Sequence, residues 1–201
     1  MTTLYSLKPR FQALLRPLVR LLAAAGITAN QVTIAAAAGS LVIGLAVAWQ
    51  ASHTAVFVLV PAWMLLRMAL NAIDGMLARE FGQQSRLGAY LNELGDAVSD
   101  AALYAPFALL PPFGSAGVGL VVVLSLLAEY AGVLGIAGGG TRRYNGPLGK
   151  SDRALAFGVI GAWAGLVGPL PPWFAFLMPL LALLLIATIV NRVRAGLRDL
   201  A

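Results

Sequence analysis

Six apolar stretches, each long enough to cross a lipid bilayer, are the main constraint on what this chain can fold into. A transmembrane helix needs about 20 predominantly apolar residues. Stretches of this kind lie near residues 32–51, 55–78, 87–110, 115–138, 152–169 and 173–191. Because 60% of the 201 residues are hydrophobic and only 11% are charged, no part of the chain is left for a separate soluble domain. The sequence predicts an all-α integral membrane bundle of six transmembrane helices.

The segment before the first stretch has the pattern of an amphipathic helix lying on the membrane surface. Between residues 9 and 25, Pro9 can occupy the first helical turn, and apolar side chains recur along one stripe. Arginines on the same helix can meet lipid headgroups. We therefore expect one domain over residues 1–201, with a surface helix and its lead-in at 1–30 and the six-helix bundle at 31–194.

Basic residues gather in segments that would face one side of the membrane. Of the 14 Lys and Arg residues, all but Arg67 lie before the first stretch, in two of the connections or at the edge of one (Arg153), or after the sixth stretch. Cytoplasmic segments of membrane proteins carry such an excess of positive charge. This pattern predicts a multi-pass protein of the bacterial inner membrane with both termini and the basic loops in the cytosol.

Polar side chains recur at helical spacing on the second and third stretches. Intramembrane carboxylates are costly and mark functional sites. The recurring residues are Asn71, Asp74 and Ala78 on the second stretch, and Gly88, Asn92, Asp96 and Asp100 on the third. Two facing helices that point oxygen ligands inward can hold a hard divalent cation such as Mg²⁺. Thiolate and histidine-rich sites are excluded, because the chain has no cysteine and a single histidine.

The segment 71–96 resembles the signature of the CDP-alcohol phosphotransferase (CDP-alcohol phosphatidyltransferase) family, Asp-x2-Asp-Gly-x2-Ala-Arg-x8-Gly-x3-Asp-x3-Asp. The matching residues are Asp74, Gly75, Ala78, Arg79, Gly88 and Asp96. Asn71 and Asn92 stand where the signature has its first and third aspartates. The surface helix, the six-helix layout and the basic loops are also similar to the family.

The resemblance implies a metal-dependent enzyme of phospholipid synthesis. It would transfer a phosphatidyl group from a CDP-linked lipid such as CDP-diacylglycerol to an alcohol or phosphorylated alcohol, and release CMP. Asp96 matches the family's general base, and Mg²⁺ or Mn²⁺ would be held by Asp74 and Asp96 with Asn71 and Asn92. Gly75, Ala78, Arg79 and Gly88 would contact the donor. Membrane lipids and a second copy of the chain are the other expected partners, and no nucleic acid is expected.

A basic loop over residues 141–153 is a second candidate site. Its cationic residues are Arg142, Arg143, Lys150 and Arg153. A turn followed by a helix start can bind the acceptor phosphate or the CDP diphosphate. The alternative is that these charges only set the membrane topology.

Arg67, Asp100 and Glu129 are charged residues deep within the apolar stretches. Arg67 and Asp100 lie at matching depths, roughly 18–20 Å from the cytosolic ends of their helices. An ion pair between them is expected, which Glu129 could join, and the alternative is that Asp100 is an extra metal ligand. The spacing Gly161-x3-Gly165 allows close helix packing, as in a homodimer.

The two asparagines leave several functions open. The site could hold one ion in place of a pair, bind metal more weakly, bind nucleotide without turnover, or use an unusual donor or acceptor. A different class of function, an ion or metabolite carrier, would use the intramembrane carboxylates to bind cargo.

Overall fold

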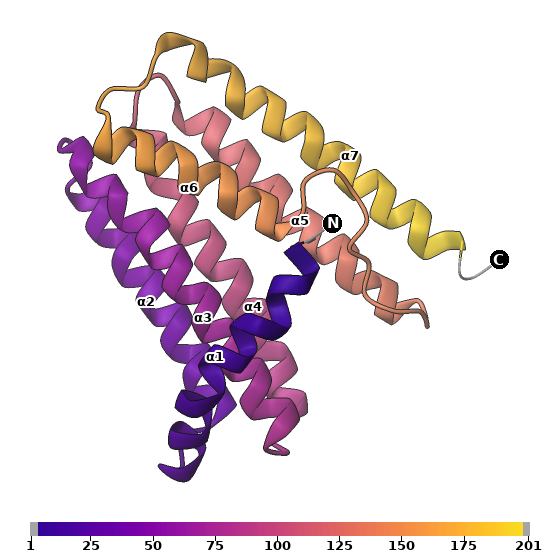
Figure 1. The fold of residues 1–201 in the computed structure, drawn as a ribbon. Coiled ribbons are helices and arrows are strands. Elements are labelled where there is room, and N and C mark those ends of the chain that lie inside the picture. Colours follow the sequence, from indigo (N-terminus) through magenta and orange to yellow (C-terminus); the bar gives the residue numbers. More distant parts are fainter. Residues whose placement is uncertain (1–3, 199–201) are drawn as a thin grey trace. The chain divides into compact units, whose positions relative to one another are not determined.

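The computed structural model describes residues 4–198, and within that range the chain is helical, with no strand. Seven α-helices follow one another along the described chain: α1 (Leu4–Ala24), α2 (Ala29–Trp49), α3 (Leu59–Glu80), α4 (Arg86–Tyr104), α5 (Ser115–Ala137), α6 (Lys150–Leu166) and α7 (Leu177–Arg198) (Figure 1). Three short 3₁₀ helices lie between them: η1 (Thr54–Val58), η2 (Ala105–Leu109) and η3 (Pro172–Phe176). Each predicted stretch therefore contains a helix, and the all-α prediction is confirmed.

The chain forms two compact units, each built from segments that are distant in sequence. Among the described residues, unit 1 comprises 4–42 and 62–99, and unit 2 comprises 43–61 and 100–198. The unit boundaries fall inside α2, near the start of α3 and inside α4. The prediction of a single domain stays a prediction.

In unit 1, α1 packs on α2 and α3 through a small apolar core. Val19 of α1 is completely buried there, and the other buried members are Ala29, Val32, Ile73, Met76 and Leu77. Leu14 and Leu18 of α1 are exposed, and the location of α1 on the membrane surface stays a prediction. The predicted start was wrong, because α1 begins at Leu4 and Pro9 lies inside the helix.

In unit 2, an aromatic core and two glycines determine the packing. The rings of Tyr104 and Phe157 stack with their centroids 4.1 Å apart, and Phe107 contacts Phe157 edge-on at 5.1 Å. A β-carbon at Gly161 would lie 3.0 Å from the carbonyl oxygen of Phe57, and one at Gly165 would lie 2.7 Å from the nitrogen of Val58. These glycines let α6 approach η1 of the same chain, so their spacing does not by itself indicate a dimer.

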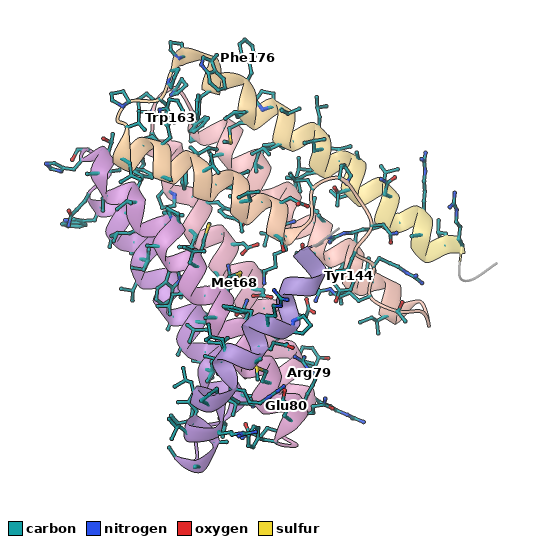
Figure 2. All side chains as sticks on the ribbon, viewed as in Figure 1. Met68, Arg79, Glu80, Tyr144, Trp163 and Phe176 are labelled. Atoms are coloured by element: carbon teal, nitrogen blue, oxygen red, sulfur yellow. The ribbon has the colours of Figure 1, made fainter. Side chains whose placement is uncertain are left out.

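Four helical segments among the described residues are long and apolar enough to cross a membrane. They are Ala29–Trp49, Thr54–Glu80, Ser115–Ala137 and Pro172–Arg198. Large apolar side chains such as Met68 and Phe176 are exposed on these segments, as expected for contact with lipid (Figure 2). α4 carries four charged residues within its 19 positions, and α6 has only 17 residues. That α4 and α6 also span the membrane stays a prediction.

Candidate functional site

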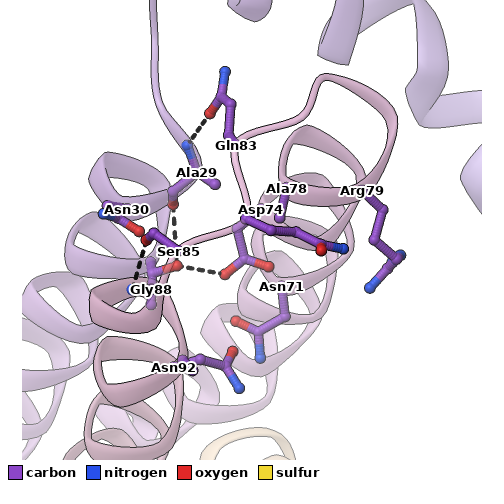
Figure 3. Close-up of a pocket in the computed structure, with 14 residues that line it drawn as sticks. Ala29, Asn30, Asn71, Asp74, Ala78, Arg79, Gln83, Ser85, Gly88 and Asn92 are labelled. Carbon is purple, nitrogen blue, oxygen red and sulfur yellow. Dashed lines mark hydrogen bonds between the residues drawn. The ribbon is translucent and has the colours of Figure 1, made fainter.

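A polar pocket of about 430 Å³ lies in unit 1, where the start of α2, the end of α3 and the start of α4 meet (Figure 3). Its lining combines amide, carboxylate, hydroxyl and guanidinium groups with small residues: Ala29, Asn30, Thr33, Asn71, Asp74, Gly75, Ala78, Arg79, Gln83, Gln84, Ser85, Gly88, Ala89 and Asn92. Seven of the predicted site residues are among them, namely Asn71, Asp74, Gly75, Ala78, Arg79, Gly88 and Asn92.

The α3–α4 connection fixes one rim of this pocket through local hydrogen bonds. Gly82 has a φ of +68°, a conformation that suits glycine and lets the chain turn after α3. Ser85 caps α4, since its Oγ accepts a hydrogen bond of 2.9 Å from the backbone nitrogen of Gly88. Gln83 Oε1 accepts a hydrogen bond of 2.7 Å from the backbone nitrogen of Ala29, which joins the connection to the start of α2.

Asp74 is the carboxylate of the pocket, and it is 6% exposed. The Thr33 hydroxyl lies 2.8 Å from Asp74 Oδ2 and 3.0 Å from the backbone oxygen of Ala29. Hydrogen bonds to an ionised acceptor are the stronger ones, so donation to Asp74 orients this carboxylate. Sequence reasoning missed Thr33, because a single threonine in an apolar stretch carries no signal of its partner.

At two glycines that line the pocket, neighbouring side chains approach the backbone closely. A β-carbon at Gly88 would lie 2.8 Å from Asn30 Oδ1 and 3.1 Å from Ser85 Oγ. A β-carbon at Gly75 would lie 2.9 Å from a guanidinium nitrogen of Arg79, the end of a flexible side chain. Any side chain at Gly88 would therefore press on the rim of the pocket.

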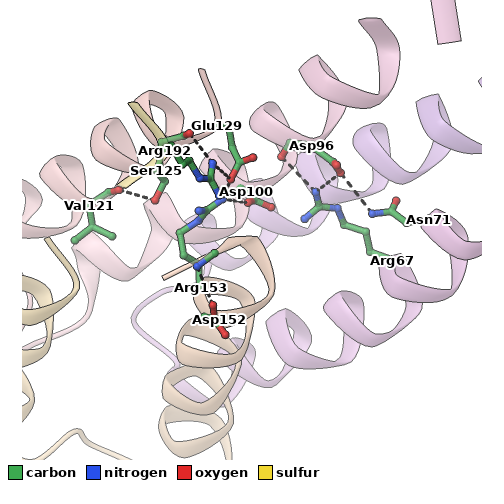
Figure 4. A network of polar contacts seen from close by, with 12 residues as sticks. Arg67, Asn71, Asp96, Asp100, Val121, Ser125, Glu129, Asp152, Arg153 and Arg192 are labelled. Carbon is green, nitrogen blue, oxygen red and sulfur yellow. Dashed lines mark hydrogen bonds and ion pairs between the residues drawn. The ribbon is translucent and has the colours of Figure 1, made fainter. Parts of the chain in front are cut away.

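Asp96 also belongs to unit 1, but it does not line this pocket. Its Oδ1 accepts a hydrogen bond of 2.9 Å from Arg67 Nη2 and a long one of 3.4 Å from Asn71 Nδ2 (Figure 4). Arg67 Nη2 also lies 3.2 Å from the backbone oxygen of Asp96. The sequence held a signal for this pair, since Arg67 lies one helical turn before Asn71 on the same stripe. The expected pair between Arg67 and Asp100 joins residues of different units and stays a prediction.

In unit 2, the predicted basic site is an internal ion cluster around Glu129 (Figure 4). The Glu129 carboxylate accepts hydrogen bonds of 2.8 Å from both Arg142 and Arg153, and Arg192 lies 3.4 Å from it. Arg153 also pairs with Asp100 Oδ2 at 3.3 Å. The contact of Arg192 with Glu129 was not predicted, because the two residues are far apart in the sequence and lie on different helices.

The other two basic candidates of this loop, Arg143 and Lys150, are half-buried. The backbone nitrogen of Arg143 donates a hydrogen bond of 3.0 Å to the backbone oxygen of Gly132. The guanidinium of Arg142 also stacks over the Tyr144 ring, with 5.1 Å to its centroid. The loop that holds these cations is therefore anchored to α5.

The pocket of unit 1 has oxygen donor atoms that suit a hard cation. Across residues 4–198, no three Asp, Glu or His side chains come together as metal ligands. The pocket instead offers the carboxylate of Asp74 with the amides of Asn71 and Asn92. Oxygen donors of this kind suit Mg²⁺ or Mn²⁺, which also keeps several waters or phosphate oxygens when bound.

Comparison with known proteins identifies the relatives of this chain. The pattern of the CDP-alcohol phosphatidyltransferase family matches residues 26–195. The chain is 46% identical over 195 residues to the inner membrane protein YnbA of Escherichia coli (strain K12), covering 97% of this chain and 96% of that protein. This chain is likewise a membrane protein, and several of its own helices are long and apolar enough to span the membrane.

Two crystal structures of the Mycobacterium tuberculosis phosphatidylinositol phosphate synthase PgsA1 share its fold. One, in complex with manganese and citrate, has a TM-score of 0.75 and 23% identity, over 90% of this chain and 87% of that one. The other, with CDP-DAG bound, has a TM-score of 0.75 and 24% identity, over 90% and 92%. At this identity the likeness concerns the fold. From the matched pattern and the identity to YnbA, the chain belongs to the CDP-alcohol phosphatidyltransferase family.

Proposed function

We propose that the protein transfers a phosphatidyl group from a CDP-linked lipid, such as CDP-diacylglycerol, to an alcohol, and releases CMP. The observation that carries this proposal is the pocket of unit 1. Five residues that match the family signature line it together, namely Asp74, Gly75, Ala78, Arg79 and Gly88. CDP-DAG is bound in a crystal structure of PgsA1, which shares the fold.

The pocket residues suit a nucleoside diphosphate. Arg79 would neutralise diphosphate charge through charge-assisted hydrogen bonds. Gly75 and Ala78 would leave a smooth wall for the cytidine. Asp74, Asn71 and Asn92 would hold Mg²⁺ or Mn²⁺, and this cation would neutralise charge on the transferred phosphate. Asp100 is a weaker ligand candidate, since its carboxylate pairs with Arg153.

Asp96 would act as the general base. It would take the proton of the acceptor hydroxyl, whose oxygen forms a bond to the phosphorus next to the lipid. The bond between that phosphorus and the bridging diphosphate oxygen breaks, and CMP leaves with the electron pair. Arg67, paired with Asp96 Oδ1, would hold the carboxylate in place.

The acceptor and the assembly are parts of the same proposal. Arg143 and Lys150 of the basic loop are candidates to bind a phosphorylated acceptor, with Arg142 and Arg153, which also contact Glu129. We place the pocket and both termini on the cytosolic side, with six helices in the membrane and two copies in a homodimer. Asn71 and Asn92 favour one variation on this function, a family member with an unusual donor or acceptor.

The test is release of CMP by the purified protein. CDP-diacylglycerol would be supplied with Mg²⁺ or Mn²⁺ and a panel of neutral and phosphorylated alcohols, and the lipid products identified by mass. We expect CMP with at least one acceptor, and none after the divalent cation is chelated. A carrier would bind cargo and release no CMP under any of these conditions, which would reject the proposal.

Gly88→Ala tests whether the pocket binds the donor. The added methyl group would meet Asn30 and Ser85 at the pocket rim, so we expect KM for the CDP-lipid to rise about tenfold, as for a loss of roughly 1.4 kcal/mol of binding. The matched control is Gly119→Ala in α5, where a β-carbon meets no atom within 4 Å. Equal kinetics for the two variants would show that the donor binds elsewhere.

A further inference from the structure

We infer that the pocket of unit 1 binds a single divalent cation, because the Arg67 guanidinium already supplies the positive charge that faces Asp96. The inference rests on the proposed function for the identity of the site, and it adds the number of cations and a role for Arg67. That role is to position and neutralise Asp96, with no contact to the reacting atoms.

The first argument is the place of the two carboxylates. Asp74 lines the pocket, whereas Asp96 does not. Two N–H donors reach Asp96 Oδ1, one from Arg67 at 2.9 Å and one from Asn71 at 3.4 Å. These contacts use the lone pairs with which that oxygen would ligate a metal. A cation at Asp96 Oδ1 would have to displace both donors.

The second argument is electrostatic. The Arg67 side chain is 6% exposed, so its charge is poorly screened by water. Guanidinium groups do not lose their proton in proteins, and the charge at Arg67 is therefore permanent. A second divalent ion beside Asp96 would meet this fixed positive charge. A single ion at Asp74 would lie in the pocket, which neither Arg67 nor Asp96 lines.

The third argument explains an asparagine at position 71. Its Nδ2 is directed to Asp96, which leaves the carbonyl oxygen of the same amide as the atom that can ligate a cation in the pocket. An aspartate at this position would have no proton to give and would face Asp96 with like charge. Asn71 thus fits a site in which Arg67 and one divalent ion balance two carboxylates.

The test counts Mn²⁺ ions on the detergent-purified full chain, with Mn²⁺ alone and with CDP added. The loss of the free Mn²⁺ resonance signal during a titration gives the stoichiometry, and Asp74→Asn gives the background. We expect one Mn²⁺ per chain above that background. Two ions per wild-type chain, or none with CDP present, would overturn the inference, whatever the behaviour of the variants.

Variants test the role of Arg67 directly. Asn71→Asp with Asn92→Asp should still bind one Mn²⁺ while Arg67 is present, and addition of Arg67→Gln should raise the number to two. Arg16→Gln, which removes an exposed pair with Glu80, is the matched control and should stay at one. A second ion on the Asn71→Asp, Asn92→Asp chain that keeps Arg67 would refute the role given to that arginine.

The CMP assay separates this inference from the proposed function. CMP release by a chain that binds two Mn²⁺ ions would reject the inference and keep the function. One bound Mn²⁺ per chain, with no CMP released from any combination of donor and acceptor, would keep the inference and reject the proposed function.

Discussion

Asp96→Asn should lower the rate of CMP release by about 100- to 10,000-fold, the contribution of a general base to such a reaction. The substitution keeps the size of the side chain and removes its ability to take the acceptor proton. Asp96 does not line the pocket, so the affinity for CDP in the presence of Mn²⁺ should stay close to that of the wild type. The measurements are single-turnover CMP release and equilibrium binding of CDP.

Loss of the Asp96 charge also leaves Arg67 without this partner, and the controls address that effect. Arg67→Gln with Asp96→Asn removes both charges, so it should restore stability while CMP release stays low. Asp152→Asn makes the same chemical change at an exposed helix start and should keep most of the activity. CMP release near the wild-type rate by folded Asp96→Asn protein would remove Asp96 from its assigned role.

Arg153→Met should lower the free energy of unfolding by about 3–5 kcal/mol, the usual cost of removing one partner from a buried ion pair. The Arg153 side chain is 1% exposed and contacts both Glu129 and Asp100. Its loss removes a buried cation that pairs with Asp100 and one of the cations around Glu129. Methionine fills a similar volume, so the effect reports mainly on charge. The measurement is unfolding in mixed micelles of rising denaturing-detergent content.

Two comparisons make this result specific to the ion cluster. Arg194→Met, at an exposed position of α7, should change stability by less than about 0.5 kcal/mol. Arg153→Met combined with Glu129→Gln should destabilise by less than the sum of the two single changes, because the Arg153–Glu129 contact can be lost only once. Strict additivity would mean that the two side chains do not interact.

The part of the candidate site formed by α3 and α4 was predictable from the sequence, whereas the part formed by α2 was not. Asp74, Gly75, Ala78 and Arg79 belong to one helix, and Gly88 and Asn92 follow a short connection, so spacing alone placed them together at one rim. Thr33 comes from a helix 41 positions earlier, and its contact with Asp74 depends on how α2 is rotated against α3. The sequence pattern of α2 alone does not determine how this helix is rotated against α3.

The sequence by itself determined the seven helices, the membrane character and the stripe of polar residues, because apolar length and helical periodicity are local properties of the chain. Only the tertiary structure showed that Arg67 contacts Asp96, and that Arg153 contacts both Glu129 and Asp100. It also assigned Gly161 and Gly165 to contacts with η1 of the same chain. Several charged residues at the same depth in the membrane are within reach of a long arginine side chain. Which of them it contacts depends on the rotation and register of the packed helices.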